Sequence, residues 1–272
     1  MARRIVKQLV IGLIFLLILA GIGYWIYNTA KPEPTCTDGI KNQGEEEIDC
    51  GGPCSLCELV HIKEIEVLWA KAIKGQGNFY DLSAKIKNPN QNYGSGQIDY
   101  QFELYDSNNQ LIAKYSDTTF ILPNQTKYLL KIKAESNLMV GEAKLSFSQV
   151  EWQKPNDYQS PSLVVQQKEY RLLNEQDLGF AQVRALLTNK SNFDFDKVDI
   201  DILLFDQDHQ LLAINTNEIR TLLAGQERDF VTTWFNPIKG QVAFIEVEPE
   251  TNIFDPDNFL SGTKERERFQ EY

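Results

Sequence analysis

The sequence predicts a mainly β protein: two tandem antiparallel β-sandwiches, preceded by an N-terminal transmembrane α-helix and a small disulfide-rich segment. Three observations support this fold class. They are an uncharged apolar run near the N-terminus, a cluster that holds all four cysteines, and an internal repeat with a period of 100 residues. The chain has 272 residues, of which 42% are hydrophobic, so it can form the cores of one or two ordinary domains. This composition excludes a wholly disordered or collagen-like chain.

The first element is an apolar run over residues 9–27, LVIGLIFLLILAGIGYWIY, within an N-terminal segment 1–30. Its 19 uncharged residues would form a helix about 28 Å long, which matches the hydrocarbon core of a bilayer. A cleaved secretory signal is the alternative, but its apolar stretch is usually about 7 to 15 residues. The length of the run and the aromatic residues at its end, Tyr24, Trp25 and Tyr27, favour an uncleaved anchor, which makes the membrane a partner.

The distribution of charge predicts the orientation of this helix. Arg3, Arg4 and Lys7 precede it, so the N-terminus should lie in the cytoplasm and the C-terminal ectodomain outside it. The whole chain carries a net charge of −11, and without these three cations the remainder carries −14. An ectodomain this acidic is repelled by nucleic acid and by anionic lipid, so we expect neither as a partner.

Residues 31–58 combine a proline spacer with the four cysteines, Cys36, Cys50, Cys54 and Cys57. An even number of clustered cysteines in an exported segment predicts two disulfides, with three pairings open. Zinc bound by four thiolates is the competing interpretation. The spacing of the first two cysteines is unlike that of a paired zinc knuckle, which favours disulfides.

Oxygen-bearing side chains gather between the first two cysteines. Asp38, Asn42, Glu45 and Asp49 lie on a glycine-containing loop, and calcium takes 6 to 8 oxygen ligands. We therefore predict calcium binding, and no other cofactor, with a solvated acidic loop as the alternative. Residues 36–57 also resemble the short cysteine-rich repeats of bacterial and archaeal surface proteins, which share a C-x-DG-x-x-N-x-x-E pattern that ends in DCGGPC.

The internal repeat aligns IDYQFELYDSNNQLIA, residues 98–113, with VDIDILLFDQDHQLLA, residues 198–213, without a gap. Further upstream, LSAKIKN ending at Asn88 parallels VRALLTN ending at Asn189. A period of this length indicates duplicated domains rather than a solenoid.

Within each copy, apolar and polar residues alternate, as in half-buried strands. Asp- and Asn-rich turns follow these strands and predict hairpins. About seven short strands per copy, with no amphipathic helix, favour an antiparallel β-sandwich. The predicted boundaries are 59–153 for the first sandwich, 154–162 for a linker, 163–254 for the second sandwich and 255–272 for a polar tail.

Two short motifs in the repeat carry a resemblance to a known family. Residues 102–106 spell FxLYD, residues 202–206 are a looser version, and Asn88 and Asn189 stand where that family has an asparagine after its second strand. The chain resembles tandem FxLYD-type immunoglobulin-like domains, which are similar to water-stress (late-embryogenesis-abundant-like) sandwiches. The resemblance covers roughly residues 60–250 and implies extracytoplasmic, non-catalytic modules.

Tyr105, Leu203 and Phe205 are candidates for a partner-binding surface. They fall on the outward phase of their strands, where an exposed apolar patch would mark an interface. Packing against a neighbouring strand edge or against the other domain is the alternative, and the sequence favours it.

Nothing in the sequence predicts catalysis. Only two histidines are present, His61 and His209, and there is no nucleophile elbow, paired-histidine zinc motif or phosphate loop. We therefore expect no enzyme and identify no small-molecule substrate. The predicted function is that of a single-pass cell-envelope protein whose two modules bind or scaffold an envelope protein, for example by strand addition at a sandwich edge. The alternative is a structural subunit of a membrane-bound envelope assembly, in which the transmembrane helix makes essential contacts.

Overall fold

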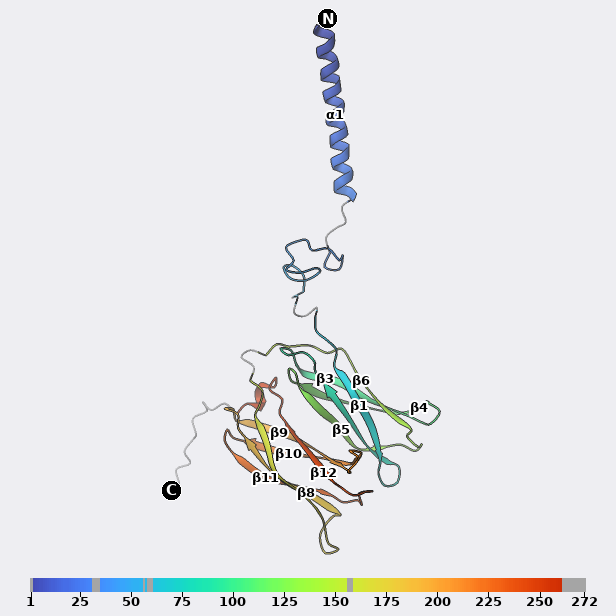
Figure 1. Cartoon of the computed structure of the whole chain (residues 1–272), viewed down its shortest axis with the longest axis vertical. Coiled ribbons are helices and arrows are strands. Elements are labelled where there is room, and N and C mark those ends of the chain that lie inside the picture. The colour runs from blue at the N-terminus through green and yellow to red at the C-terminus, as the bar shows by residue number, and fades with distance from the viewer. Residues whose placement is uncertain (1, 31–34, 56, 58–60, 156–158, 261–272) are drawn as a thin grey trace, which may run out of the picture. The chain divides into compact units, whose positions relative to one another are not determined.

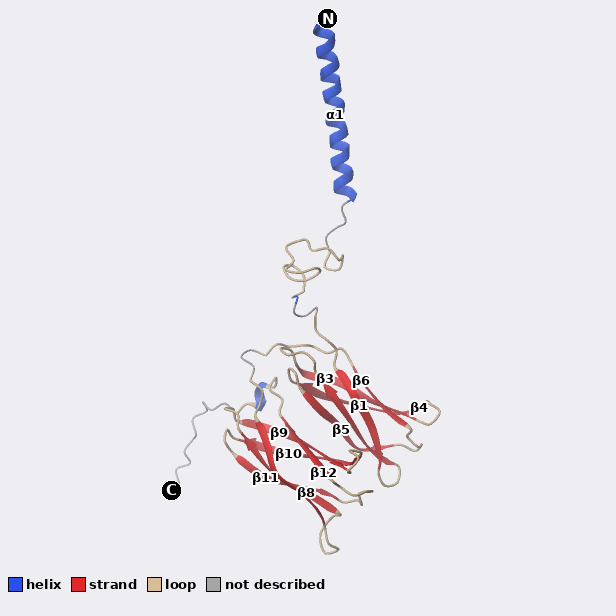
Figure 2. Cartoon of the chain, in the orientation of Figure 1, coloured by secondary structure: helices blue, strands red, loops and turns tan. Residues whose placement is uncertain are grey.

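The structure is a computed structural model that describes residues 2–30, 35–55, 57, 61–155 and 159–260. The proline spacer at 31–34, part of the predicted linker and most of the predicted polar tail lie outside the described residues. The chain forms two compact units, Met1–Ile62 and Lys63–Tyr272. Strands dominate the second unit, as Figures 1 and 2 show, so the predicted mainly β class is confirmed.

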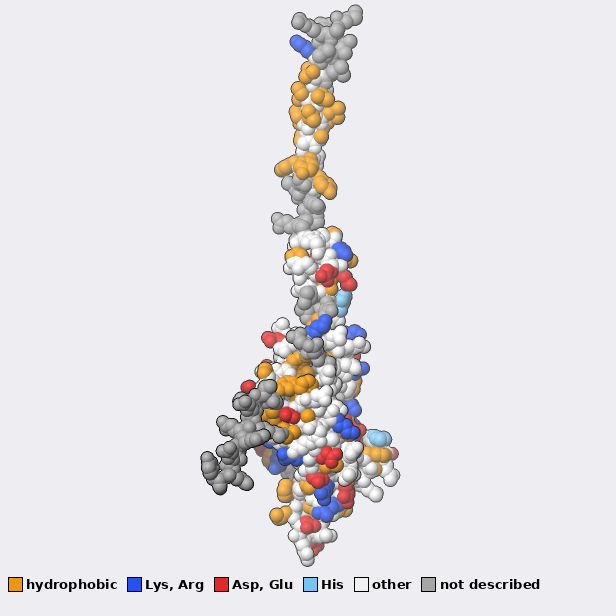
Figure 3. Space-filling view, turned by 90° about the vertical axis from the view of Figure 1, so that its left-hand side faces the viewer, with side chains coloured by type: hydrophobic (Ala, Val, Ile, Leu, Met, Phe, Trp, Pro, Cys, Tyr) orange, Lys and Arg blue, Asp and Glu red, His pale blue; other side chains and the backbone are white. Residues whose placement is uncertain are grey.

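The first unit begins with helix α1, Ala2–Ala30. Its window Val10–Tyr27 is long and apolar enough to cross a membrane, although a signal sequence would meet the same criteria. Hydrophobic side chains cover the middle of this helix on the face that Figure 3 shows, and residues 9–27 carry no charge on any face. A helix that is apolar on every side is suited to lipid rather than to one face of a soluble core.

The cysteine module contains two disulfides, Cys36–Cys54 and Cys50–Cys57. The prediction of two disulfides is thus confirmed, and the sulfurs are not available as zinc thiolates. The chain reverses tightly at Gly52, where φ is +58° and a Cβ atom would lie 2.5 Å from the carbonyl oxygen of Gly44. Only glycine fits at this position.

The first sandwich consists of two three-stranded antiparallel sheets, β1-β2-β5 and β4-β3-β6. Its strands are β1 Glu66–Lys74, β2 Phe79–Lys87, β3 Ser95–Tyr105, β4 Leu111–Ile121, β5 Thr126–Glu135 and β6 Glu142–Phe147. The alternating apolar residues of β2 and β3, such as Leu82, Ile86, Phe102 and Leu104, are fully buried between the two sheets. Their opposite faces point out of the sandwich.

The second sandwich repeats this arrangement in the sheets β11-β8-β7 and β10-β9-β12. Its strands are β7 Leu163–Leu172, β8 Ala181–Asn189, β9 Phe195–Phe205, β10 Leu211–Leu222, β11 Glu227–Trp234 and β12 Phe244–Glu250. Among the residues that the structure describes, each copy has six strands rather than about seven. The turn from β4 to β5, and its counterpart from β10 to β11, is too short to hold another strand.

The two repeated asparagines have equivalent structural roles. Asn88 Nδ2 donates hydrogen bonds to the carbonyl oxygens of Tyr93 (2.6 Å) and Leu122 (2.9 Å). Asn189 Nδ2 donates to the corresponding carbonyl oxygens of Phe193 (2.8 Å) and Leu222 (3.2 Å). Both side chains are fully buried, so each satisfies backbone groups that would otherwise lack partners.

The two repeated aspartates close the hairpins that follow β3 and β9. Asp106 Oδ1 accepts from the backbone N–H groups of Asn108 and Gln110, both at 2.8 Å. Asp206 Oδ1 accepts in the same pattern from residues two and four positions later. The last residue of the FxLYD motif is therefore a turn-forming residue in both copies.

The two sandwiches pack directly against each other through what we call the junction. It joins the outer face of β1-β2-β5 to the outer face of β10-β9-β12. The junction contains Trp69, Ile73, Tyr128, Leu130 and Ile132 from the first sandwich and Leu203, Phe205, Leu211 and Ile214 from the second. The four sheets thus form successive layers of one body.

Burial in the junction corrects one part of the predicted partner surface. Leu203 is 0% exposed and Phe205 is also buried, so the prediction that they form an exposed patch is wrong. The alternative, packing against the other domain, describes them correctly. Their side chains leave β9 on the face opposite to the core of the second sandwich, and the first sandwich covers that face.

Gly94 and Gly96 bring the second copy still closer to the first. A Cβ atom at Gly96 would lie 2.6 Å from Cβ of Phe254, and one at Gly94 would lie 2.8 Å from the ring of the same residue. Asn252 Nδ2 also donates to the carbonyl oxygen of Gly96 at 3.1 Å. The Gly-Ser-Gly segment is therefore a close-approach site between the two copies.

The segment after β12 folds back onto the second sandwich. A short 3-10 helix spans Pro256–Asn258, and the buried Asn258 accepts from the backbone N–H of Lys197 at 2.8 Å. The ring of Phe259 packs against Phe195 and Phe193. Residues 255–260, placed in the polar tail by composition, are thus part of the second sandwich because buried side chains hold them.

Candidate functional site

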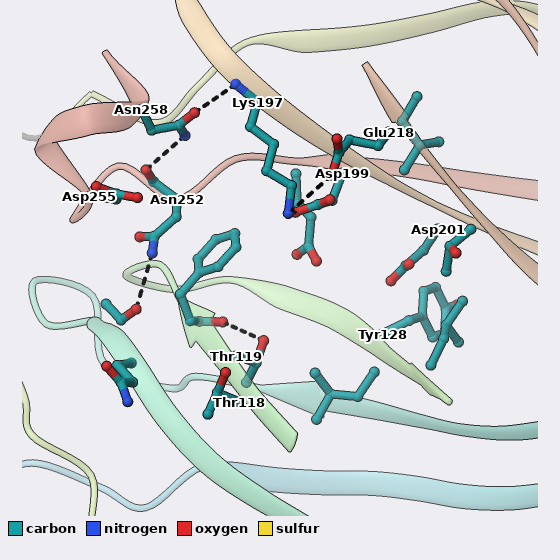
Figure 4. Close-up of a pocket in the computed structure, with 18 of the residues that line it drawn as sticks. Thr118, Thr119, Tyr128, Lys197, Asp199, Asp201, Glu218, Asn252, Asp255 and Asn258 are labelled. Carbon is teal, nitrogen blue, oxygen red and sulfur yellow. Dashed lines mark hydrogen bonds and ion pairs between the residues drawn. The ribbon is translucent and has the colours of Figure 1, made fainter. Parts of the chain in front are cut away.

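A cleft of about 830 Å³ opens between the two sandwiches, beside the junction. Hydroxyl and aromatic side chains of the first sandwich, including Thr118, Thr119, Tyr100 and Tyr128, form one wall. Seven carboxylates form the other wall, all from the second sandwich: Asp196, Asp199, Asp201, Glu218, Glu250, Asp255 and Asp257. Figure 4 shows the acidic side chains of β9 and β10 across the cleft from the hydroxyl groups.

Strand alternation places these acids in the cleft. One face of β9 points toward the first sandwich and holds residues 199, 201, 203 and 205. The other face fills the core of the second sandwich with residues 198, 200, 202 and 204. The apolar pair at 203 and 205 forms the junction. The acidic pair, Asp199 and Asp201, lines the cleft at the other end of the same face.

Most of the acids near the mouth of the cleft have a cationic partner. Lys197 Nζ lies 2.9 Å from Asp199 and 3.4 Å from Glu218. Arg220 pairs with Glu218 at 2.6 Å and with Asp196 at 3.2 Å. These side chains are substantially exposed, so each pair contributes little to stability.

A buried ion pair connects the two sandwiches at the cleft. Lys127 Nζ of β5 lies 2.6 Å from a carboxylate oxygen of Glu250 in β12, and the lysine side chain is only 4% exposed. The same ammonium donates to Thr119 Oγ1 at 3.0 Å and to the carbonyl oxygen of Phe120 at 3.2 Å. Burial raises the pKa of Glu250, and the attraction of Lys127 opposes this rise.

Asp201 differs from the other acids of the cleft. It is only 8% exposed, and no hydrogen bond or ion pair to its carboxylate occurs among the residues that the structure describes. Burial raises the pKa of Asp201 well above its ordinary value, and the negative charge of Glu250 raises it further, while Lys127 acts in the opposite direction. Asp201 is therefore a desolvated carboxyl group without a partner.

A second polar link crosses the junction beside the cleft. The phenol of Tyr128 donates to the carboxylate of Glu246 and accepts from Lys85 Nζ at 2.9 Å. Burial, followed by the hydrogen bond to Glu246, raises the pKa of Tyr128, so the phenol stays protonated as the donor. This chain of contacts helps to fix the two sandwiches relative to each other.

The predicted calcium ligands hold the loop of the cysteine module. Asp38 accepts from the backbone N–H of Ile40 (2.8 Å), and both carboxylate oxygens of Asp49 accept from the backbone N–H of Gly39. The buried carboxylate of Glu45 accepts from the backbone N–H groups of Asn42 (3.1 Å) and Asp49 (3.3 Å).

These contacts engage the carboxylates in hydrogen bonds within the loop. Hydrogen bonding to Asn42, and to backbone N–H groups, lowers the pKa of Asp38. Among the described residues, no three carboxylates of this loop come within 4.8 Å of one another. The side-chain oxygen of Asn42, Oδ1, is buried without a hydrogen-bond partner, so it could coordinate a cation.

Tyr105, the remaining residue of the predicted partner surface, is half-buried. Its hydroxyl donates to Glu103 at 2.8 Å, and Lys144 Nζ lies 4.7 Å from the centre of its ring. The side chain of Tyr105 thus contacts Glu103 and Lys144 of its own sandwich.

Exposed apolar side chains occur instead in loops that sequence reasoning did not single out. Met139 in the β5–β6 loop is 83% exposed, Leu178 in the β7–β8 loop 89%, and Phe235 in the β11–β12 loop 73%. These loops lie at the end of the body away from the segment that leads into β1 (Figure 1). Single apolar residues within loops give no periodic signal, which is why the sequence did not reveal them.

Of the two histidines, His209 belongs to the sandwich body and does not line the cleft, and His61 belongs to the other unit. His61 Nε2 is 3.2 Å from Glu47 in the cysteine module, and the ring of His209 stacks on Phe244 at 4.5 Å.

Comparisons with known proteins leave the question of function open. No family model matches the sequence, and no curated protein matches it. Among solved structures, the chain is similar to a point mutant of oxalate decarboxylase from Bacillus subtilis, at 7% identity and a TM-score of 0.10, over 68% of this chain and 77% of the other. A similarity this weak supports no inference about fold or function.

Proposed function

We propose that the chain is a single-pass cell-envelope protein that holds a non-catalytic pair of immunoglobulin-like sandwiches outside the cytoplasm to bind a protein partner. The FxLYD resemblance supports the non-catalytic part of this proposal.

The anchor and its orientation have two independent lines of support. Helix α1 can cross a bilayer, and Arg3, Arg4 and Lys7 precede its apolar window, which favours a cytoplasmic N-terminus. The two disulfides follow the helix and require an oxidising compartment, which is the side that the basic residues predict.

The observation that carries the binding proposal is the exposure of Met139, Leu178 and Phe235 at one end of the sandwich body. Apolar side chains that gather on one exposed surface mark an interaction site, and aromatic residues and Met are enriched in the cores of interfaces. Lys63, at the start of this body, exchanges hydrogen bonds with Asn90 in the β2–β3 loop, at the opposite end. The apolar loops thus lie far from the segment that leads to the anchor.

Strand addition is less favoured than loop binding at the edges whose contacts the structure shows. Asn215 and Asn217 of β10 donate their side-chain amides to the carbonyl oxygens of Thr233 and Val231 on β11, both at 3.1 Å. Lys168 of β7 donates to the carbonyl oxygen of Ile245 on β12 at 3.1 Å. These side chains occupy acceptors that an added strand would need.

A photo-crosslinking amino acid in place of Leu178 or Phe235 tests this proposal in intact cells. Both positions should give the same crosslinked protein, and a probe at the exposed Asn124, in the β4–β5 turn at the other end, should not. No adduct from either loop, or the same adduct from Asn124, would contradict binding at this end. Replacement of residues 9–27 by an unrelated anchor distinguishes this proposal from the alternative of a structural subunit. A displayed binding module should keep its function, whereas a structural subunit should lose it.

Calcium binding by the cysteine module remains a second proposal. Asn42 supports it, because its buried Oδ1 lacks a partner while its Nδ2 donates to Asp38 and its backbone N–H donates to Glu45. Calorimetric titration of the full chain with calcium should show millimolar or tighter affinity that the Asp38→Asn substitution weakens. The absence of any saturable heat would remove this proposal.

A further inference from the structure

The cleft between the sandwiches has an excess of negative charge that its own cations do not balance. Seven carboxylates line it, whereas the cations that pair with them are Lys127, Lys197 and Arg220. The excess would attract a cationic ligand and repel an anionic one.

Asp201 is the residue of the cleft at which a bound cation would gain the most favourable interaction energy. Its carboxylate lines the cleft and is more than nine-tenths buried, yet the nearest buried ammonium, that of Lys127, is hydrogen-bonded to Glu250, Thr119 and the backbone. An ionised carboxylate buried without a partner is unfavourable, so burial favours the protonated form of the free Asp201 side chain, and a cation in the cleft would favour its ionised form. A cation that enters the cleft would supply the missing partner.

The dimensions of the cleft indicate an organic cation rather than a metal ion. About 830 Å³ is the size of a small-molecule site, far more than one ion needs. Calcium requires several oxygens at 2.3–2.6 Å from one point, and no three carboxylates of the cleft lie within 4.8 Å of one another among the described residues. The rings of Tyr100 and Tyr128 and the hydroxyl groups of Thr118 and Thr119 suit an ammonium group on a carbon chain.

We propose that the cleft binds a small organic cation with primary ammonium groups, such as a diamine or polyamine, with Asp201 as its buried counter-ion. This site is separate from the apolar loops and does not depend on their function.

Calorimetric titration of the full chain in detergent micelles with spermidine and with 1,5-diaminopentane tests this proposal. Both should bind saturably, and the Asp201→Asn substitution should weaken binding at least about tenfold, because a charge-assisted hydrogen bond contributes about 1.5–3 kcal/mol. The Asp208→Asn substitution removes the same charge from the exposed β9–β10 turn and should leave binding unchanged.

A second variant tests the same site without loss of an acid. Thr216 is the cross-strand neighbour of Asp201 on β10, so Thr216→Lys places an ammonium group beside this carboxylate. This substitution should abolish diamine binding and raise the melting temperature. Absence of saturable amine binding, equal weakening by Asp201→Asn and Asp208→Asn, or binding of calcium chloride in place of the amines would overturn the proposal.

Discussion

The Leu203→Ala substitution tests whether the junction makes the two sandwiches one cooperative body. Leu203 is fully buried and contacts the junction rather than either sandwich core. Removal of three carbon atoms at about 0.8 kcal/mol each gives about 2.4 kcal/mol of lost transfer free energy, and the remaining cavity raises the cost to about 3 kcal/mol. That cost is a large fraction of the total stability of a typical domain, which is about 5–15 kcal/mol.

Urea unfolding of the full chain, followed by tryptophan fluorescence, measures this effect. Trp69 reports on the junction and Trp234 on the core of the second sandwich. We expect one shared transition that shifts to lower urea in the variant. The control Leu172→Ala, at an exposed position of β7, should change the unfolding free energy by less than about 0.5 kcal/mol. Two independent transitions in the wild type, or a change below about 1 kcal/mol for Leu203→Ala, would refute the reasoning.

Three further predictions concern the close approach, the cleft and the cysteine module. Gly96→Ala should lower the unfolding free energy by about 1–3 kcal/mol in denaturant titrations, and much less in a Phe254→Gly background, because the new Cβ collides with Phe254. Asp201→Asn should gain stability relative to the wild type as the pH rises from about 3 to 7. The pKa of Asp201 is higher in the folded than in the unfolded protein, so this group stabilises the wild type fully below its unfolded-state pKa, and the stabilisation is lost as the pH rises through its folded-state pKa. A difference in unfolding free energy between variant and wild type that stays constant across several pH values would contradict this. The double substitution Cys36→Ser and Cys54→Ser should cost the module about 3 kcal/mol and expose it to protease, while the melting temperature of the sandwiches, which form a separate unit, stays the same.

The sequence predicted the features that depend on a periodic pattern of residues or on covalent bonds between cysteines. Alternation along residues 98–104 and 198–204 predicted the strands β3 and β9, because one side of each strand fills a core. Clustered cysteines predicted the two disulfides, although their pairing depends on how the loop folds and came only from the structure. These features are local, so the sequence alone contains them.

The features that the sequence did not reveal depend on contacts between distant residues. Alternation could not show whether solvent or the first sandwich covers the outer face of β9, so Leu203 was a candidate for an exposed patch. For the same reason Asp201 resembled any surface acid until its burial was known. The role of Gly96 required Phe254, more than 150 positions later, to be placed against it.

The central claim is that the sandwich body is displayed outside the cytoplasm. A membrane-impermeant maleimide, applied to intact cells that produce the chain with either Ser107→Cys or Lys7→Cys, measures this directly. Ser107 lies in the exposed β3–β4 turn, and Lys7 precedes the apolar window of α1. The account predicts labelling at position 107 in intact cells, and at position 7 only after the membrane is permeabilised. Labelling at position 7 in intact cells, with position 107 protected until permeabilisation, would contradict it.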